Sequence, residues 1–168
     1  MLFRSYNLSE TSREKAVNLE DYIPSRWLEY PITMGNPVIF LKAKKAYYDS
    51  IAFAIHTIPH VKGYVSKKMP GRLHFGKNPR SLDFTIIAEA GWSIITNPPE
   101  LIKKGNHGYD NREKDMWAIF YATGPAFKKG YVQKIFPNIP VSPLIAYLLG
   151  IGIPPADGKF KPVRKILK

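Results

Sequence analysis

Residues 83–96 read DFTIIAEAGWSIIT, a run dominated by β-branched, aromatic and small apolar side chains. Pro79 precedes this run and the sequence NPP at 97–99 follows it, and both favour turns over a continued strand. An apolar run of this length, bounded by turn residues, predicts a strand at the centre of a sheet.

Shorter apolar runs on both sides of this stretch predict further strands. They lie at residues 16–23, 38–41, 61–68, 73–75 and 116–123. The run at 61–68 predicts an edge strand. Residues 1–16 are polar with no sustained period and predict irregular structure.

Two stretches carry helix signals. Residues 42–58 place apolar side chains at steps of three and four, with lysines on the other face, and Pro59 ends the pattern. In residues 142–150, Ser142 suits the N-cap, Pro143 the first helical position and Gly150 the stop. Strands that alternate with helices in this way predict an α/β fold.

Length and composition predict one domain over residues 1–168, with a basic tail at 159–168 that is bound to the surface or frayed. An apolar run of about 18 residues, the length that spans a bilayer, is absent, and residues 1–15 lack the apolar core of a secretory signal. Cysteine is absent, which excludes disulfides, thiolate zinc sites and cysteine nucleophiles. Any metal must therefore rest on His, Asp or Glu.

The net charge of +12 favours nucleotides, nucleic acid or anionic surfaces as partners. Lysines at 42, 44 and 45, at 67 and 68 and along the tail interleave with Tyr47, Tyr48 and Tyr64, a pattern that nucleic-acid binding and a solvated helix face both explain. Glycine-rich phosphate loops of the Walker or dinucleotide kind and a serine elbow are absent from the sequence. The sequence gives those enzyme classes no support.

Three of the four histidines are interpreted as structural. His56 and His60 are four residues apart, a spacing that suits a metal on one helix face, but Pro59 between them breaks that geometry. His74 lies in the sequence GRLHF with no acidic residue nearby, and we interpret it as a packing residue or as part of a strand surface.

His107 differs because it lies in a loop between two apolar runs, at 83–96 and 116–123. Loops at strand ends of α/β sheets are where ligand-binding side chains concentrate. Asp110 is close enough in sequence to bind a metal, orient the imidazole or cap a turn. A zinc site needs three or four ligands and this loop supplies at most two, so the residues alone favour a structural role.

The sequence GNHGYDN at 105–111, followed by DMWAIFYATGPAFK at 115–128, resembles type I phosphodiesterase/nucleotide pyrophosphatases. This is the ectonucleotide phosphodiesterase branch of the alkaline phosphatase superfamily. Further segments resemble the family in the same order, so the resemblance extends from about Ser9 to the end of the chain. They are VNLEDYI (17–23), VKGYVSKKMPGRLHF (61–75), NPRSLDFTIIAEAGWSI (78–94) and PPADGKFKPVRKILK (154–168).

The resemblance implies a partial alkaline-phosphatase-like α/β sandwich, comprising the C-terminal portion of the sheet with flanking helices. It also implies a hydrolase that splits phosphodiester or pyrophosphate bonds of nucleotides or related compounds. Family members hold two zinc ions with Asp and His ligands, and the metals activate a threonine nucleophile that forms a phospho-threonine intermediate. The histidine of the family's NHGYDN motif is a zinc ligand, which implies that His107 is one too. Tyr109, Asp110 and Asn111 are expected to shape the loop instead.

The chain departs from the family where its catalytic centre should begin. The nucleophile and the other metal ligands belong to family segments upstream, and in the place of an Asp-His-Gly segment the chain has MLFRSYNL (1–8). We therefore expect an incomplete portion of such an enzyme that needs a missing N-terminal portion and is inactive alone. It is an expressed fragment, a truncated gene product or a standalone derivative.

Two other readings stay open. One is a non-catalytic basic module that binds nucleic acid or anionic surfaces, and the other is a chain that folds poorly because strand edges are exposed. Localisation stays unknown, since the family is usually extracytoplasmic and the chain has no signal peptide. Substrate identity and oligomeric state are also unreadable.

Overall fold

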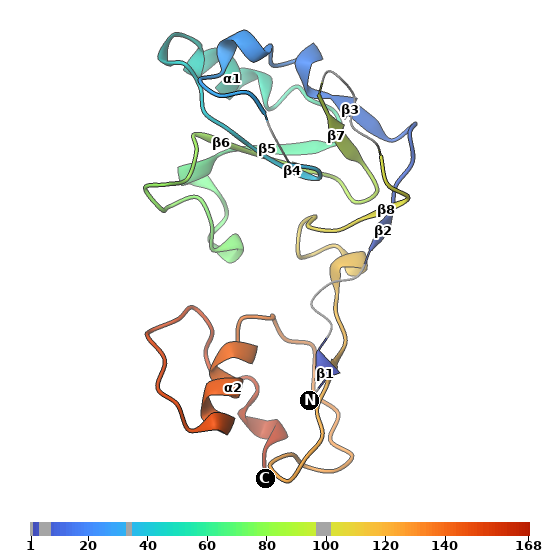
Figure 1. Cartoon of the computed structure of the whole chain (residues 1–168), viewed down its shortest axis with the longest axis vertical. Coiled ribbons are helices and arrows are strands. Elements are labelled where there is room, and N and C mark those ends of the chain that lie inside the picture. Colours follow the sequence, from blue (N-terminus) through green and yellow to red (C-terminus); the bar gives the residue numbers. More distant parts are fainter. Residues whose placement is uncertain (1, 4–7, 33–34, 97–101) are drawn as a thin grey trace. The chain divides into compact units, whose positions relative to one another are not determined.

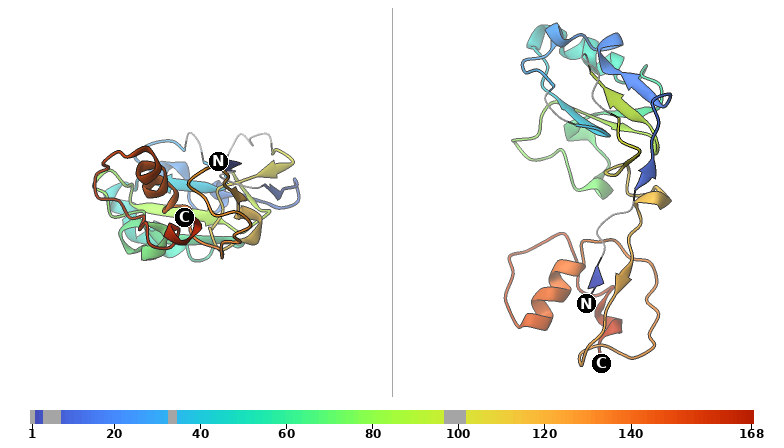
Figure 2. Two further views of the ribbon diagram at one scale, coloured as in Figure 1. Left: turned by 90° about the horizontal axis from the view of Figure 1, so that it is seen from below. Right: turned by 45° about the vertical axis from the view of Figure 1, so that its right-hand side comes forward.

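The computed structural model describes residues 2–3, 8–32, 35–96 and 102–168. They fall into two compact units (Figures 1 and 2). The larger unit is Tyr6–Trp117, and the smaller unit joins Met1–Ser5 to Ala118–Lys168. The assignment of residues 1–168 to one partial domain stays a prediction.

An antiparallel sheet forms the centre of the larger unit (Figure 1). Its order is β4 (Val38–Leu41), β6 (Phe84–Ala88) and β5 (Val61–Val65). The central strand predicted within 83–96 is therefore confirmed as β6. The edge strand predicted at 61–68 is confirmed over its first five residues, as β5. Every residue of β6 is buried. The run at 83–96 does not continue as one strand, because Gly91 adopts φ of 83° and turns the chain.

Beyond Gly91, β7 (Ser93–Ile95) pairs in parallel with β3 (Ala16–Asn18). The strand predicted at 16–23 is therefore confirmed only over its first three residues. The next three residues, Leu19–Asp21, form a 3-10 turn in which the Asn18 side chain accepts a hydrogen bond from the Glu20 backbone N–H. In the segment predicted to be irregular, β2 (Ser9–Glu10) also forms a short ladder.

Helix α1 (Tyr48–Ala54) lies along one side of the sheet (Figure 1) and is shorter than the predicted helix at 42–58. The Asp83 carboxylate accepts hydrogen bonds from Lys42 Nζ and from the backbone N–H of Ala43, both at 3.1 Å. These contacts, with a 3-10 turn at Lys45–Tyr47, delay the start of the helix. The hydrogen bonds to Asp83, which is distant in the sequence, therefore outweigh the local preference of residues 42–47 for a helix.

The main core lies between α1 and the sheet. It includes the fully buried side chains Ile39, Ile51, Ile55, Phe84 and Ile86. Gly63 of β5 passes so close to α1 that a Cβ there would lie 2.5 Å from the Ile55 carbonyl oxygen. Only glycine fits this crossing.

The segment at 66–76 contacts the sheet face that carries Phe40 and Thr85. Ser66 and Thr85 share a buried hydroxyl hydrogen bond of 2.8 Å, and the rings of Phe40 and Phe75 are 5.1 Å apart. The strand predicted at 73–75 is wrong. Gly71–Leu73 is a 3-10 turn and His74 is left-handed, because the backbone N–H groups of Leu73 and His74 bond back to Pro70 and Gly71.

In the smaller unit, β1 (Leu2–Phe3) pairs with β9 (Phe120–Tyr121). The strand predicted at 116–123 is reduced to these two residues of β9, since Lys114–Met116 is a 3-10 turn. Helix α2 (Val141–Leu149) has Pro140 at its N-cap and not the predicted Ser142, whereas the predicted stop at Gly150 is confirmed by its φ of 66°.

The C-terminal tail is not frayed. Val163, Ile166 and Leu167 are buried with Phe127 and Leu144, and Arg164–Ile166 forms a 3-10 turn. The basic residues of the tail are exposed at the same time, so its charge and its packing coexist. Within the described ranges, α1 and α2 are both too short to cross a membrane.

Candidate functional site

The His107 loop, residues 105–111, begins at a strand. Strand β8 (Gly105–Asn106) pairs with β2, in the register Ser9 opposite Asn106. Asn106 Nδ2 donates to the Asn36 carbonyl oxygen at 3.2 Å, and Asn106 Oδ1 accepts from the His107 backbone N–H at 2.9 Å. The residue before His107 is therefore held by backbone and side-chain bonds.

The other side of the loop is held by Gly108 and Tyr109. Gly108 has φ of 99°, a conformation that favours glycine, and lies against Pro37. Tyr109 is 5% exposed, belongs to the main core and donates its hydroxyl to the Trp92 carbonyl oxygen at 3.0 Å. Burial raises the pKa of Tyr109 to about 12, so the hydroxyl stays protonated and able to donate to higher pH than an ordinary tyrosine does.

Asp110 is buried and fully engaged. One Nη atom of Arg72 donates to Asp110 Oδ1 at 2.7 Å and the other donates to Oδ2, and Oδ1 also accepts from the Arg112 backbone N–H at 3.0 Å. The Arg72 guanidinium holds the pKa of Asp110 below its usual range. With both oxygens paired to Arg72, Asp110 shapes the loop, in agreement with the prediction from the sequence.

His107 itself is exposed between these fixed points. Its imidazole suits zinc as a borderline nitrogen donor. In the part of the chain that the structure describes, no three His, Asp or Glu side chains gather to hold a metal. The donors present therefore fit one ligand of a zinc site and not a complete site.

The other histidines lie apart from this loop. His56 is exposed beyond the end of α1, so His56 and His60 do not share a helix face. His60 is left-handed, stacks on Trp92 with ring centroids 3.5 Å apart and places Nδ1 3.1 Å from Glu89 Oε2. His74 is exposed and left-handed. The interpretation that His56 and His60 lie at a helix end followed by a turn is confirmed.

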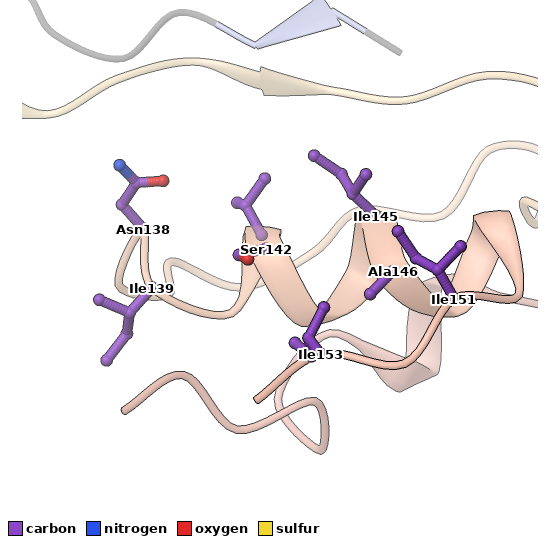
Figure 3. A pocket seen from close by; sticks show the side chains of 8 residues that line it. Asn138, Ile139, Ser142, Ile145, Ala146, Ile151 and Ile153 are labelled. Atoms are coloured by element: carbon purple, nitrogen blue, oxygen red, sulfur yellow. The ribbon is translucent and has the colours of Figure 1, made fainter. Parts of the chain in front are cut away.

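The smaller unit carries a groove of about 450 Å³ along α2 (Figure 3). Isoleucines dominate its lining, with Asn138 and Ser142 as the polar members. Among the described residues that line the groove, no side chain titrates near neutral pH. This chemistry suits apolar contact and does not suit phosphoryl transfer.

Arg72 is the residue of the site that sequence analysis did not single out. It lies 38 positions before Asp110, and its role depends on a contact that periodicity does not encode. The sequence feature that could have identified Arg72 is its position in GRLHF, which is part of the segment at 61–75 that resembles the phosphodiesterase family.

Comparison with known proteins identifies the class. A family model described as Type I phosphodiesterase / nucleotide pyrophosphatase matches residues 6–110, from the start of the larger unit to Asp110. The match covers more than half of the chain, and the chain belongs to this family. The partial alkaline-phosphatase-like α/β fold predicted from the resemblance is also confirmed, by the structural match that follows.

The solved structure of human ectonucleotide pyrophosphatase/phosphodiesterase 5 matches with a TM-score of 0.89 at 30% identity, over 99% of this chain and 44% of that chain. In sequence, family member 5 from Homo sapiens is 31% identical over 96% of this chain and 34% of its own length. Bis(5'-adenosyl)-triphosphatase from Xenopus laevis is 29% identical over 96% of this chain and 35% of its own length. The chain thus spans about a third of the length of these curated relatives.

Proposed function

We propose that this chain is the C-terminal portion of a zinc-dependent phosphodiesterase/nucleotide pyrophosphatase in which His107 supplies one zinc ligand. The nucleophile and the remaining ligands come from a preceding portion of the family domain, and the chain alone is inactive. The observation that carries the proposal is the His107 loop, which presents one exposed imidazole between fixed neighbours in a chain of this family.

The residues of the loop have separate roles in this proposal. Zinc, when bound, withdraws charge from the phosphoryl group and activates the nucleophile. His107 would hold the metal through a ring nitrogen, Asn106 and Tyr109 fix the backbone on either side, and Asp110 anchors the end of the loop. A fixed backbone reduces the conformational freedom that His107 loses when it binds.

The substrate class we propose is nucleotides or related compounds with a phosphodiester or pyrophosphate bond. Two relatives support it by their descriptions. The Xenopus laevis protein is a bis(5'-adenosyl)-triphosphatase, and a solved structure of murine member 5, an inactive variant, contains AMP. The murine structure matches this chain with a TM-score of 0.88 at 26% identity, over 99% of this chain and 44% of that chain.

The coding sequence upstream of Met1 gives the first test. We expect the same reading frame to continue and to encode a threonine nucleophile, further aspartates and an Asp-His-Gly segment. In-frame stop codons directly upstream would contradict the proposal, because the chain would then lack a preceding portion of its own.

Activity gives the second test. We expect the purified chain with added zinc to hydrolyse a chromogenic nitrophenyl nucleotide ester no faster than zinc in buffer. A hybrid enzyme, in which this chain replaces the matching region of human member 5, should hydrolyse the ester, and His107→Ala should reduce kcat/KM at least about 100-fold. His56→Ala, at an exposed histidine outside the loop, is the matched control. Turnover by the chain alone that His107→Ala abolishes would contradict the proposed inactivity.

The net charge of +12 favours a second candidate, a non-catalytic module that binds nucleic acid or an anionic surface. This candidate predicts affinity for single-stranded DNA that falls steeply with salt and does not change on zinc removal or His107→Ala. Fluorescence anisotropy between 50 and 200 mM salt, roughly the range over which such binding weakens, would measure it.

A further inference from the structure

The turn that carries Arg72 is itself fixed to the sheet. Ser66 bonds Thr85 beneath it, Met69 is buried, and Phe75 lies against Phe40. Gly76, with φ of 93°, passes so close to Ser66 that a Cβ would meet its carbonyl oxygen. The guanidinium of Arg72 therefore projects from a backbone that has little freedom to move.

Arg72 joins this fixed turn to two consecutive residues of the His107 loop. Its two Nη atoms bind the two oxygens of Asp110, and one of them also donates to Asn111 Oδ1 at 2.6 Å. The fork geometry of arginine sets direction as well as distance, which a lysine ammonium cannot do. Asp110 is 6% exposed, so its charge has little water to replace this partner.

The contact between Arg72 and Asp110 affects His107 because Asp110 lies three positions after it in the same loop. Gly108 lies between His107 and the buried Tyr109, and a glycine adopts many backbone conformations when its neighbours are released. Asp110 also accepts backbone hydrogen bonds from Arg112 through its side chain and from Glu113 through its carbonyl, both at 3.0 Å. Without the Arg72 contact, the buried Asp110 carboxylate has no charged partner and becomes stable only when water reaches it. We expect that movement to break the hydrogen bonds from Arg112 and Glu113.

We propose that Arg72 is a positioning residue of the metal site: its bidentate contact with Asp110 fixes the His107 loop in the conformation that presents the imidazole. Arg72 acts through Asp110 and does not contact the metal or the substrate. The function of this arrangement rests on the proposed role of His107 as a zinc ligand.

The first test uses the full chain without metal and compares Arg72→Gln with Arg72→Lys. Arg72→Gln should speed amide hydrogen exchange at Arg112 and Glu113 about 10-fold or more, and should increase the mobility of the His107 imidazole in NMR relaxation. Arg72→Lys should recover the exchange only partly, because lysine keeps the charge without the fork. Exchange in β6 should not change.

Lys42→Gln is the matched control, since it breaks another ion pair of the larger unit between residues far apart in the sequence, Lys42 and Asp83, at 3.1 Å. It should leave exchange at Arg112 and Glu113 and the mobility of His107 unchanged. Equal effects of Lys42→Gln and Arg72→Gln on the loop would overturn the inference, as would an unaltered loop in Arg72→Gln.

The second test separates this inference from the proposed function. In the hybrid enzyme, Arg72→Gln should lower kcat about 10- to 100-fold with little change in KM, as for residues that orient a metal ligand. If His107→Ala abolishes activity and Arg72→Gln has no effect, the positioning role is wrong and the proposed function stands. If the loop loosens in Arg72→Gln but His107→Ala leaves the activity intact, the proposed function is wrong and the structural contact stands without its role at a metal site.

Discussion

The two compact units bury their apolar side chains to very different extents. Among the residues that the structure describes, the main core of the larger unit contains sixteen buried residues, whereas the core of the smaller unit contains five. The smaller unit also exposes apolar side chains along and before α2, among them Val132, at 89% exposure, and Ile135, at 81%. The stability of the larger unit therefore rests on a sheet and helix that cover each other, and that of the smaller unit on a few contacts between α2 and the tail.

This difference matters for the candidate site because the His107 loop belongs to the larger unit. Tyr109 is part of the main core, so the loop gains its fixed geometry from the same packing that stabilises the sheet. A perturbation of that core should reach the loop, whereas a surface change along α2 should have little effect on stability.

The largest effect should follow from truncation in the main core. Phe84, in the central strand, has no exposed surface, and Phe84→Ala should destabilise the chain by about 3–5 kcal/mol. Urea unfolding followed by circular dichroism would measure this loss. Ile135→Ala, at a highly exposed position, should change the free energy of unfolding by less than about 0.5 kcal/mol. If Phe84→Ala and Ile135→Ala lower the free energy of unfolding by similar amounts, the contrast in packing between the two units is wrong.

An intermediate effect should appear at alkaline pH through Tyr109. Its pKa is raised from 10.0 to about 12, so the folded state keeps a proton that the unfolded state releases. The stabilisation from the neutral hydroxyl is fully present below pH 10 and should be lost as the pH rises toward 12. Thermal unfolding between these pH values should show a decline that is weaker in Tyr109→Phe. An equal decline in both proteins would count against this assignment.

The smallest effect should come from the groove along α2. Its exposed isoleucines should bind an apolar fluorescent dye, and Ile145→Ser should reduce that fluorescence about twofold without a measurable change in melting temperature. Phe53→Ser, at an exposed aromatic residue of the larger unit, is the control and should leave most of the dye signal. If Phe53→Ser lowers the signal as much as Ile145→Ser does, the groove is not the main dye site.

The sequence predicted the sheet of the larger unit well because its strands are continuous apolar runs ended by turn residues. Residues 38–41 and 84–88 form strands on this basis. Residues 116–119 have similar composition without a strand, since strand formation also needs a partner at the right register, which composition does not specify. The helix predicted from 42 was shortened by Asp83, forty positions away from Ala43.

The residues of the candidate site also differ in whether the sequence alone could indicate them. His107 was selected by its place in a loop and by the resemblance to the family, both of which are local properties of the sequence. Arg72 was not selected, because its contact with Asp110 joins two loops that come together only when the sheet has formed. Local patterns thus indicated the metal-binding candidate, and tertiary structure was needed to find the residue that anchors its loop.

Zinc-edge anomalous diffraction from crystals of the hybrid enzyme would test the central claim most directly. We predict an anomalous peak about 2.0–2.1 Å from a ring nitrogen of His107, the usual distance between zinc and histidine. We also predict that this peak disappears or weakens strongly in His107→Ala. Full zinc occupancy in both proteins with no peak beside His107 would contradict the claim that this residue is a zinc ligand.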